Sequence, residues 1–163
     1  QMQKVLNQML DWREHCYIPE IHKTFSLKPG AKLMICGTMN PSTYGGTFDL
    51  NQDLKSRFSI IKIGFPKEAK EKEIVTSQVM IPNVSLLQQL ETIAIESRNG
   101  ISQGTYSYAI STRDIIQTLE IYNLYPPELK NEALRLGILN KFDEDQERKT
   151  MTERIRAVMG ITL

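Results

Sequence analysis

Two polar side chains, Asn40 and Arg57, are of types that can contact a phosphate group. Asn40 follows an apolar run at residues 33–36, and an amide at the end of a buried strand can hold a water molecule and a phosphate oxygen without adding charge. Arg57 precedes a second apolar run at residues 58–65, and arginine binds phosphate through two parallel hydrogen bonds. Each has an ordinary interpretation too, because Asn40-Pro41 is a common turn initiator and an arginine before a strand is often a solvated edge charge.

A third candidate, Arg113, lies in the sequence Ser111-Thr112-Arg113-Asp114, which we expect to open a helix. Ser111 is a favourable N-cap residue, and Asp114 three residues later can complete a capping box. The first turn of a helix disfavours a cation, so an anion near Arg113 would offset that cost. The alternative is a surface arginine paired with Asp114 or Glu120.

The first third of the chain is predicted to contain short elements that precede and flank the two apolar runs. Apolar spacing predicts an amphipathic helix over residues 2–12. Residues 17–27 are compatible with a small hairpin or with a plain connecting loop. The uninterrupted apolar runs at 33–36 and 58–65 are typical of strands buried on both faces, and a short helix is expected over residues 49–56.

From Pro66 onward the composition predicts helices. The sequence KEAKEKE at residues 67–73 mixes charges at helical spacing, which indicates a solvated helix face. The apolar stripes that predict further helices fall at residues 86–94, 115–122, 134–139 and 151–159. Two strands buried on both faces cannot form a stable sheet alone, so we expect an incomplete α/β part followed by an all-helical part, within a longer protein.

The sequence GTMNPSTYGGTFDLNQDLKSRF at residues 37–58 resembles AAA+ ATPases of the MoxR, McrB and midasin group. In these proteins a buried strand ends in an A/G-T-x-N-P motif, which is followed by a glycine-containing loop, a leucine-anchored helix and an Arg-Phe pair. The resemblance implies that Asn40 is the sensor 1 residue and orients the attacking water. It implies that Arg57 is an arginine finger offered to the neighbouring subunit, and that Arg113 is the sensor 2 residue that contacts nucleotide phosphate.

The same resemblance implies a two-part fold. Residues 1–66 would be the C-terminal half of an AAA+ α/β core, with about two buried strands of a parallel sheet and a hairpin before sensor 1. Residues 67–163 would be the helical lid subdomain.

The chain departs from the family in lacking the motifs that bind most of the nucleotide. It contains no G-x-x-x-x-G-K-[ST] loop and no apolar run followed by Asp-Glu. ATP and magnesium would therefore be bound mainly by residues outside this chain, and we expect the chain alone neither to bind ATP tightly nor to hydrolyse it.

The function implied by the resemblance belongs to the parent protein. A homo-oligomeric ring, a hexamer in this family, would couple ATP hydrolysis to the remodelling or activation of a partner protein complex. The alternative is a non-catalytic adaptor or regulatory domain that kept an AAA+-derived fold.

Composition restricts the remaining function classes. The formal net charge is +1, from 20 basic and 19 acidic residues, which argues against a nucleic-acid-loading role. No apolar run approaches the roughly 20 residues that a membrane span needs. The chain has no C-x-x-C motif, and its two histidines, His15 and His22, lack metal-site spacing. A disulfide between Cys16 and Cys36 is conceivable, but Cys36 lies in an apolar run and is expected to be a buried, reduced thiol. The cytoplasm is the expected compartment.

Overall fold

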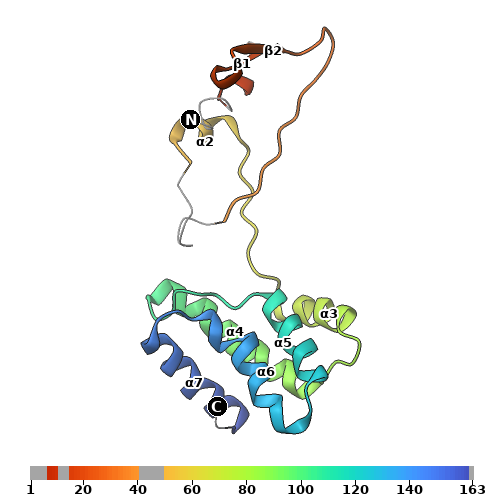
Figure 1. Cartoon of the computed structure of the whole chain (residues 1–163), viewed down its shortest axis with the longest axis vertical. Helices are drawn as coiled ribbons and strands as arrows, with labels where there is room; N and C mark the ends of the chain where they lie inside the picture. The colour runs from red at the N-terminus through yellow and green to blue at the C-terminus, as the bar shows by residue number, and fades with distance from the viewer. Residues whose placement is uncertain (1–6, 11–14, 41–49, 162–163) are drawn as a thin grey trace. The chain divides into compact units, whose positions relative to one another are not determined.

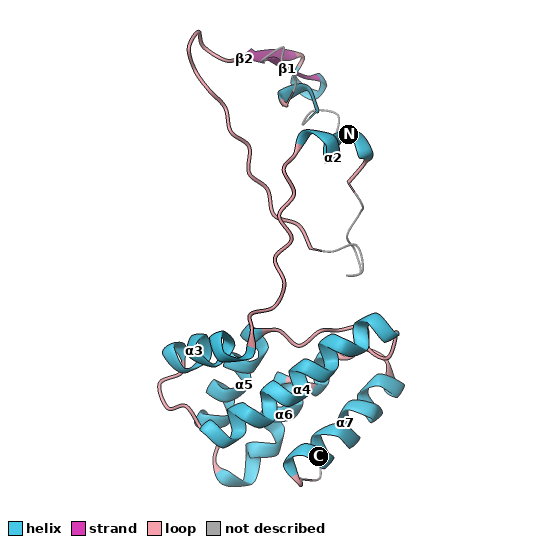
Figure 2. Ribbon diagram, turned by 180° about the vertical axis from the view of Figure 1, so that it is seen from behind, coloured by secondary structure: helices cyan, strands magenta, loops and turns pink. Residues whose placement is uncertain are grey.

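The computed structural model describes residues 7–10, 15–40 and 50–161. The chain divides into two compact units, Gln1–Ile63 and Gly64–Leu163, and the boundary predicted at Pro66 lies beside this division. Helices dominate the described residues, and their one sheet is a two-stranded antiparallel hairpin in the first unit (Figures 1 and 2).

The hairpin of the first unit is formed by β1 (His15–Ile18) and β2 (Lys23–Ser26). The two strands pair antiparallel, with Cys16 opposite Phe25. The short 3-10 helix η1 (Pro19–Ile21) joins them. The hairpin predicted over residues 17–27 is therefore confirmed, and the alternative of a plain loop is wrong.

The turn of the hairpin ends at a residue in an uncommon conformation. His22 has a φ of 50° and caps η1 by donating its backbone N–H to the Pro19 carbonyl. Its Nδ1 lies 3.1 Å from the hydroxyl of Tyr17 on β1. The left-handed backbone conformation of His22 is one that residues other than glycine seldom adopt.

The two apolar runs predicted as buried strands are not strands in the structure. Residues 31–40 and 58–66 have no regular secondary structure, and the described residues contain no parallel sheet. Met34 is 84% exposed and Ile61 is 82% exposed. Strands that are buried on both faces need neighbouring strands on both edges. The described residues supply no such neighbours, so these two runs do not form strands here. The expectation that Cys36 is buried is wrong for the same reason, because its thiol is free and exposed.

Between the two runs lies the helix α2 (Gln52–Arg57). The side chain of Asn51 caps it by accepting a hydrogen bond of 2.9 Å from the Leu54 backbone N–H, and Leu54 is fully buried. The short helix expected over residues 49–56 is thus present with a later start. Its predicted first residue, Asp49, lies outside the described residues.

The second unit is built of helices joined by short segments. Their bounds are α3 (Glu68–Gln78), α4 (Val84–Gln103), α5 (Thr112–Leu124), η2 (Pro127–Leu129), α6 (Lys130–Gly137), η3 (Leu139–Lys141) and α7 (Asp145–Met159). The helix α4 ends where Gly104, with a φ of 70°, closes it in the left-handed conformation.

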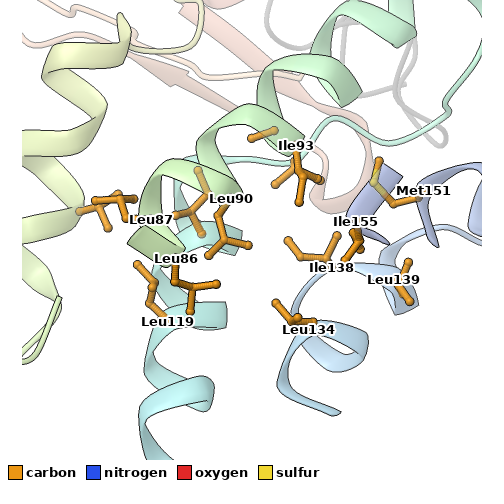
Figure 3. Close-up of a cluster of buried hydrophobic side chains, with 14 of the residues drawn as sticks. Leu86, Leu87, Leu90, Ile93, Leu119, Leu134, Ile138, Leu139, Met151 and Ile155 are labelled. Carbon is orange, nitrogen blue, oxygen red and sulfur yellow. The ribbon is translucent and has the colours of Figure 1, made fainter. Parts of the chain in front are cut away.

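A single apolar core holds these helices together. Figure 3 shows side chains of α4 facing those of α5, α6 and α7 across the core, with Leu90 and Ile93 contributed by α4. Both are fully buried, as are Ile115 and Leu119 of α5. The apolar stripes predicted from the sequence form this core because each stripe covers one face of its helix.

The helices α5 and α6 approach each other closely at one glycine. A β-carbon placed on Gly137 would lie 2.2 Å from the hydroxyl oxygen of Thr118, which is too close for any side chain. That hydroxyl donates a hydrogen bond of 2.6 Å to the Asp114 carbonyl and is fully buried. Glycine is therefore required at this position for the two backbones to pack.

Candidate functional site

The predicted site residues of the first unit lie at the surface. Asn40 is exposed in the irregular segment that follows residues 33–36, and Arg57 is the exposed last residue of α2. The glycine-containing loop predicted between them lies at residues 41–49, outside the described residues. The backbone of Arg57 is held in helical conformation by α2, which the Asn51 side chain caps.

The third predicted residue, Arg113, is exposed in the first turn of α5 in the second unit. The predicted capping box is confirmed. The Ser111 side chain accepts from the Asp114 backbone N–H at 3.3 Å, and the Asp114 carboxylate accepts from the Ser111 backbone N–H at 2.8 Å. The sequence pattern found this feature because a capping box depends only on residues three positions apart.

The carboxylate of Asp114 is occupied by groups other than Arg113. Asp114 Oδ2 accepts hydrogen bonds from the hydroxyls of Ser111 at 2.7 Å and Tyr108 at 2.9 Å. Lys141 places its Nζ 3.4 Å from Oδ1. Among the ion pairs of the described residues, Arg113 has no acidic partner, so the alternative in which it pairs with Asp114 or Glu120 is not what the structure contains.

A buried ion pair that the sequence analysis missed lies beside the first turn of α5. Glu71 of α3 is 2% exposed and Arg98 of α4 is 10% exposed at their side chains. Arg98 Nη1 donates to Glu71 Oε2 at 2.8 Å, and Nη2 donates to Oε1 at 2.7 Å, which is the bidentate geometry that makes such pairs strong. The predicted solvated face at residues 67–73 is therefore wrong at Glu71.

The ion pair also contacts α5 and the beginning of the second unit. Thr112, the first residue of α5, donates its hydroxyl to Glu71 Oε1 at 2.6 Å. The Arg98 guanidinium carbon lies 4.1 Å from the centre of the Phe65 ring, a cation–π geometry. Glu71 thus joins three helices through one carboxylate.

Opposing effects set the pKa of Glu71. Burial alone would raise it, but the hydrogen bonds from Arg98 and Thr112 and the charge of Arg98 outweigh burial and lower the pKa of this carboxyl below 4.5. Glu71 is therefore ionised at neutral pH, which keeps it an acceptor for all three hydrogen bonds.

A second buried carboxyl, Glu91 of α4, behaves in the opposite way. It is 4% exposed, and its Oε1 has no hydrogen-bond partner among the described residues. Burial, followed by the charges of Glu68 and Glu71, raises the pKa of Glu91 above 4.5, and Lys72 and Arg98 offset only part of that rise. Spacing was the available signal for both buried acids, since Glu71 precedes the buried Val75 by four residues and Glu91 lies between Leu87 and Ala94.

The charges around the start of α5 leave Arg113 without a neutralising partner. The buried acids that contact this turn, Glu71 and Asp114, are balanced by Arg98 and Lys141. Arg113 adds a positive charge at the helix terminus that already carries the positive end of the dipole. An anion that reaches this turn would meet an unneutralised cation at the positive end of the helix dipole, which favours phosphate.

A cavity of about 650 Å³ lies elsewhere in the second unit. Its lining includes Glu68, Tyr106 and the ion pair between Glu96 and Arg154. None of the three predicted site residues lines it. For magnesium, the described residues offer no group of three or more His, Cys, Asp and Glu side chains arranged around one point.

Comparison with known proteins relates the chain to bacterial proteins of similar sequence. No model of a known protein family matches it. It is 29% identical over 145 residues to the uncharacterized protein YojN of Bacillus subtilis, which covers 88% of this chain and 46% of YojN. It is 24% identical over 152 residues to the uncharacterized protein SH1500 of Staphylococcus haemolyticus, which covers 93% of this chain and 56% of that protein.

The chain thus spans about half the length of these curated relatives. No helix within the described part of the chain is both long and apolar enough to cross a membrane.

Proposed function

We propose that this chain is the sensor and lid part of a ring-forming AAA+ ATPase, which couples ATP hydrolysis to remodelling or activation of a partner protein complex in the cytoplasm. The observation that carries the proposal is the motif series at residues 37–58, in which Asn40, a glycine-containing loop, a leucine-anchored helix and Arg57 occur in the order of the MoxR, McrB and midasin group. The buried Leu54 on α2 supports it, because that leucine is the expected anchor.

The exposed apolar runs support the same proposal. Residues 33–36 and 58–65 would pair with strands from the rest of the parent protein to form a parallel sheet. Apolar strands with unpaired backbone groups need such neighbours, because each neighbour buries the side chains and satisfies the hydrogen bonds. Asn40 would then stand at the carboxyl end of a central strand, where open α/β sheets bind ligands.

Each candidate residue would have a separate task at the nucleotide. Asn40 would orient the attacking water, Arg57 would stabilise charge on the γ-phosphate bound by a neighbouring subunit, and Arg113 would contact phosphate from the lid. The unneutralised charge of Arg113 fits phosphate binding. Magnesium and most of the ATP contacts would come from residues outside this chain, where the bound metal would neutralise phosphate charge.

The experiment measures ATP turnover and ATP binding in the parent protein. Arg57→Ala is expected to lower turnover by about a thousandfold, the usual worth of an arginine finger, and to leave ATP affinity unchanged. Lys55→Ala is the matched control, because Lys55 is an exposed cation on the same helix. Normal turnover in the Arg57 variant would contradict the assignment.

A mixing experiment tests whether Arg57 acts across a subunit boundary. Rings that combine Arg57→Ala subunits with Asn40→Ala subunits contain interfaces where an intact Asn40 faces an intact Arg57. Mixed rings should therefore recover part of the turnover that each variant lacks alone. Absence of recovery in rings shown to be mixed would place Arg57 outside the neighbour's site.

The alternative function is a non-catalytic adaptor or regulatory domain with an AAA+-derived fold. The sequence of the parent protein decides between the two, because an ATPase requires G-x-x-x-x-G-K-[ST] and an Asp-Glu pair elsewhere in the polypeptide.

A further inference from the structure

The backbone on both sides of Arg113 is fixed by buried groups, although Arg113 itself is exposed. On the N-terminal side, Ile110 is held by α4 through both of its backbone groups. Its N–H donates to the Ser97 hydroxyl at 3.0 Å, and its carbonyl accepts from Arg98 Nε at 2.8 Å. Ile110 and Ser97 are fully buried, so these bonds are shielded from water.

Thr112 continues this attachment into the helix. Its hydroxyl donates to Glu71 Oε1 at 2.6 Å, and the same oxygen accepts from Arg98 Nη2 at 2.7 Å. Arg98 therefore holds Ile110 directly and Thr112 through Glu71. After Arg113, the capping carboxylate of Asp114 closes the turn.

The hydrogen-bonding capacity of this network is directed at the backbone of the turn. Glu71 uses both oxygens, and Arg98 uses three of its donor nitrogens on Glu71 and Ile110. A charged pair that only joined α3 to α4 would not need the additional bonds to Ile110 and Thr112. Buried, fully satisfied networks of this kind select one arrangement of the groups that they hold.

We propose that Thr112, Glu71 and Arg98 are positioning residues that hold the first turn of α5 so that Arg113 is presented to a nucleotide phosphate. This inference rests on the proposed function. These three residues would not touch the nucleotide themselves. They would hold the exposed Arg113 in position before the phosphate binds, and such preorganisation strengthens the contact between Arg113 and phosphate without adding a new one.

The first test uses Thr112→Val in the parent protein. Valine keeps the shape of threonine, removes the hydroxyl and leaves the Glu71–Arg98 pair intact. ATP affinity and kcat/KM are each expected to fall about tenfold, because small misplacements of a phosphate-contacting group weaken binding and turnover together. Thr112→Ser, which restores the hydroxyl, is expected to stay within about twofold of the wild type.

The second test separates positioning from general stability. If Thr112 acts through Arg113, adding Thr112→Val to Arg113→Ala should change kcat/KM by less than about twofold, since coupled residues are not additive. Independent, multiplying effects of the two substitutions would overturn the inference. So would an unchanged ATP affinity in a folded Thr112→Val protein.

The third test needs no nucleotide and uses the 163-residue chain itself. Amide hydrogen exchange at the start of α5 is expected to be about tenfold faster in Thr112→Val than in the wild type or in Thr112→Ser. Equal exchange rates would overturn the positioning role. If ATP turnover by the parent protein falls in Arg113→Ala but not in Thr112→Val, this inference alone is wrong. If the parent protein binds no ATP, the proposed function and this inference are both wrong.

Discussion

The two units of the chain use apolar side chains in opposite ways. In the second unit, apolar stripes from α4, α5, α6 and α7 meet in a common core. In the first unit, residues 33–36 and the part of the second apolar run at residues 58–63 are largely exposed. The difference teaches that apolar content does not decide whether a segment folds. An amphipathic helix buries its stripe against its neighbours along the chain, whereas a central strand needs partners on both edges.

The largest expected effect comes from truncating isoleucine in the two units. Ile93 is fully buried and Ile61 is 82% exposed. In this chain, Ile93→Ala should lower the free energy of unfolding of the second unit by about 4 kcal/mol, because it creates a cavity in the core. Ile61→Ala should change it by less than about 0.5 kcal/mol. Urea unfolding followed by far-UV circular dichroism measures both.

The substitution Ile61→Ala also tests, in the parent protein, whether the second apolar run becomes buried. If residues 58–65 become a central strand there, Ile61→Ala should cost about 3 kcal/mol in the parent. An Ile61→Ala parent as stable as the wild type would show that this segment stays exposed.

The next largest effect concerns the buried ion pair. Glu71→Gln leaves the Arg98 charge buried without a counter-ion, so it should cost about 3 kcal/mol of unfolding free energy at neutral pH. The matched control is Glu73→Gln, because the Lys70–Glu73 pair is exposed and such pairs contribute about 0.5 kcal/mol or less. Equal effects of the two substitutions would contradict the buried network.

The pH dependence of the same pair has a definite sign. The pKa of Glu71 is lower in the folded state than its ordinary value of 4.5 because of Arg98 and Thr112, despite burial. Its contribution to stability is therefore complete above pH 4.5 and is lost as the pH falls through the folded-state pKa. Acid titration of wild type and Glu71→Gln should show the two stabilities converging in that acidic range.

A smaller effect is expected at the glycine between α5 and α6. Gly137→Ala forces a β-carbon against the Thr118 hydroxyl and should cost about 2 kcal/mol through overpacking. Gly64→Ala is the control, because a β-carbon on Gly64 meets no atom within 4 Å. Thermal unfolding of the two variants compares them, and a stable Gly137→Ala protein would show that the helices separate easily.

The smallest effect is a gain in stability. Glu91→Gln removes a charge that burial and the neighbouring Glu68 and Glu71 disfavour, so it should stabilise the second unit by about 1 kcal/mol at neutral pH. The pKa of Glu91 is raised in the folded state, so the penalty begins as the pH rises above 4.5 and disappears below it. A gain that persists at lower pH would assign the effect to packing instead.

The sequence predicted the features that depend on neighbours along the chain. The apolar stripes and the capping box of Ser111 and Asp114 follow from spacings of three to four residues, and the hairpin was one of two alternatives for residues 17–27. The strands at 33–36 and 58–65 were predicted from apolar content alone, and their partners are not among the described residues. Glu71 was missed because a charged run resembles a solvated face, and only its spacing from Val75 shows that it points inward.

The contact between Gly137 and Thr118 has a mechanical consequence. Because the backbone of α6 at Gly137 packs directly against the Thr118 side chain of α5, and Lys141 just beyond α6 is paired with Asp114, these two helices should rotate together as one rigid body. A sub-ångström displacement of Arg113 at one end would then swing the far ends of both helices through a longer arc. If the second unit is the lid proposed above, this coupling would carry a change at the nucleotide to the far end of α5, where Leu124 is exposed.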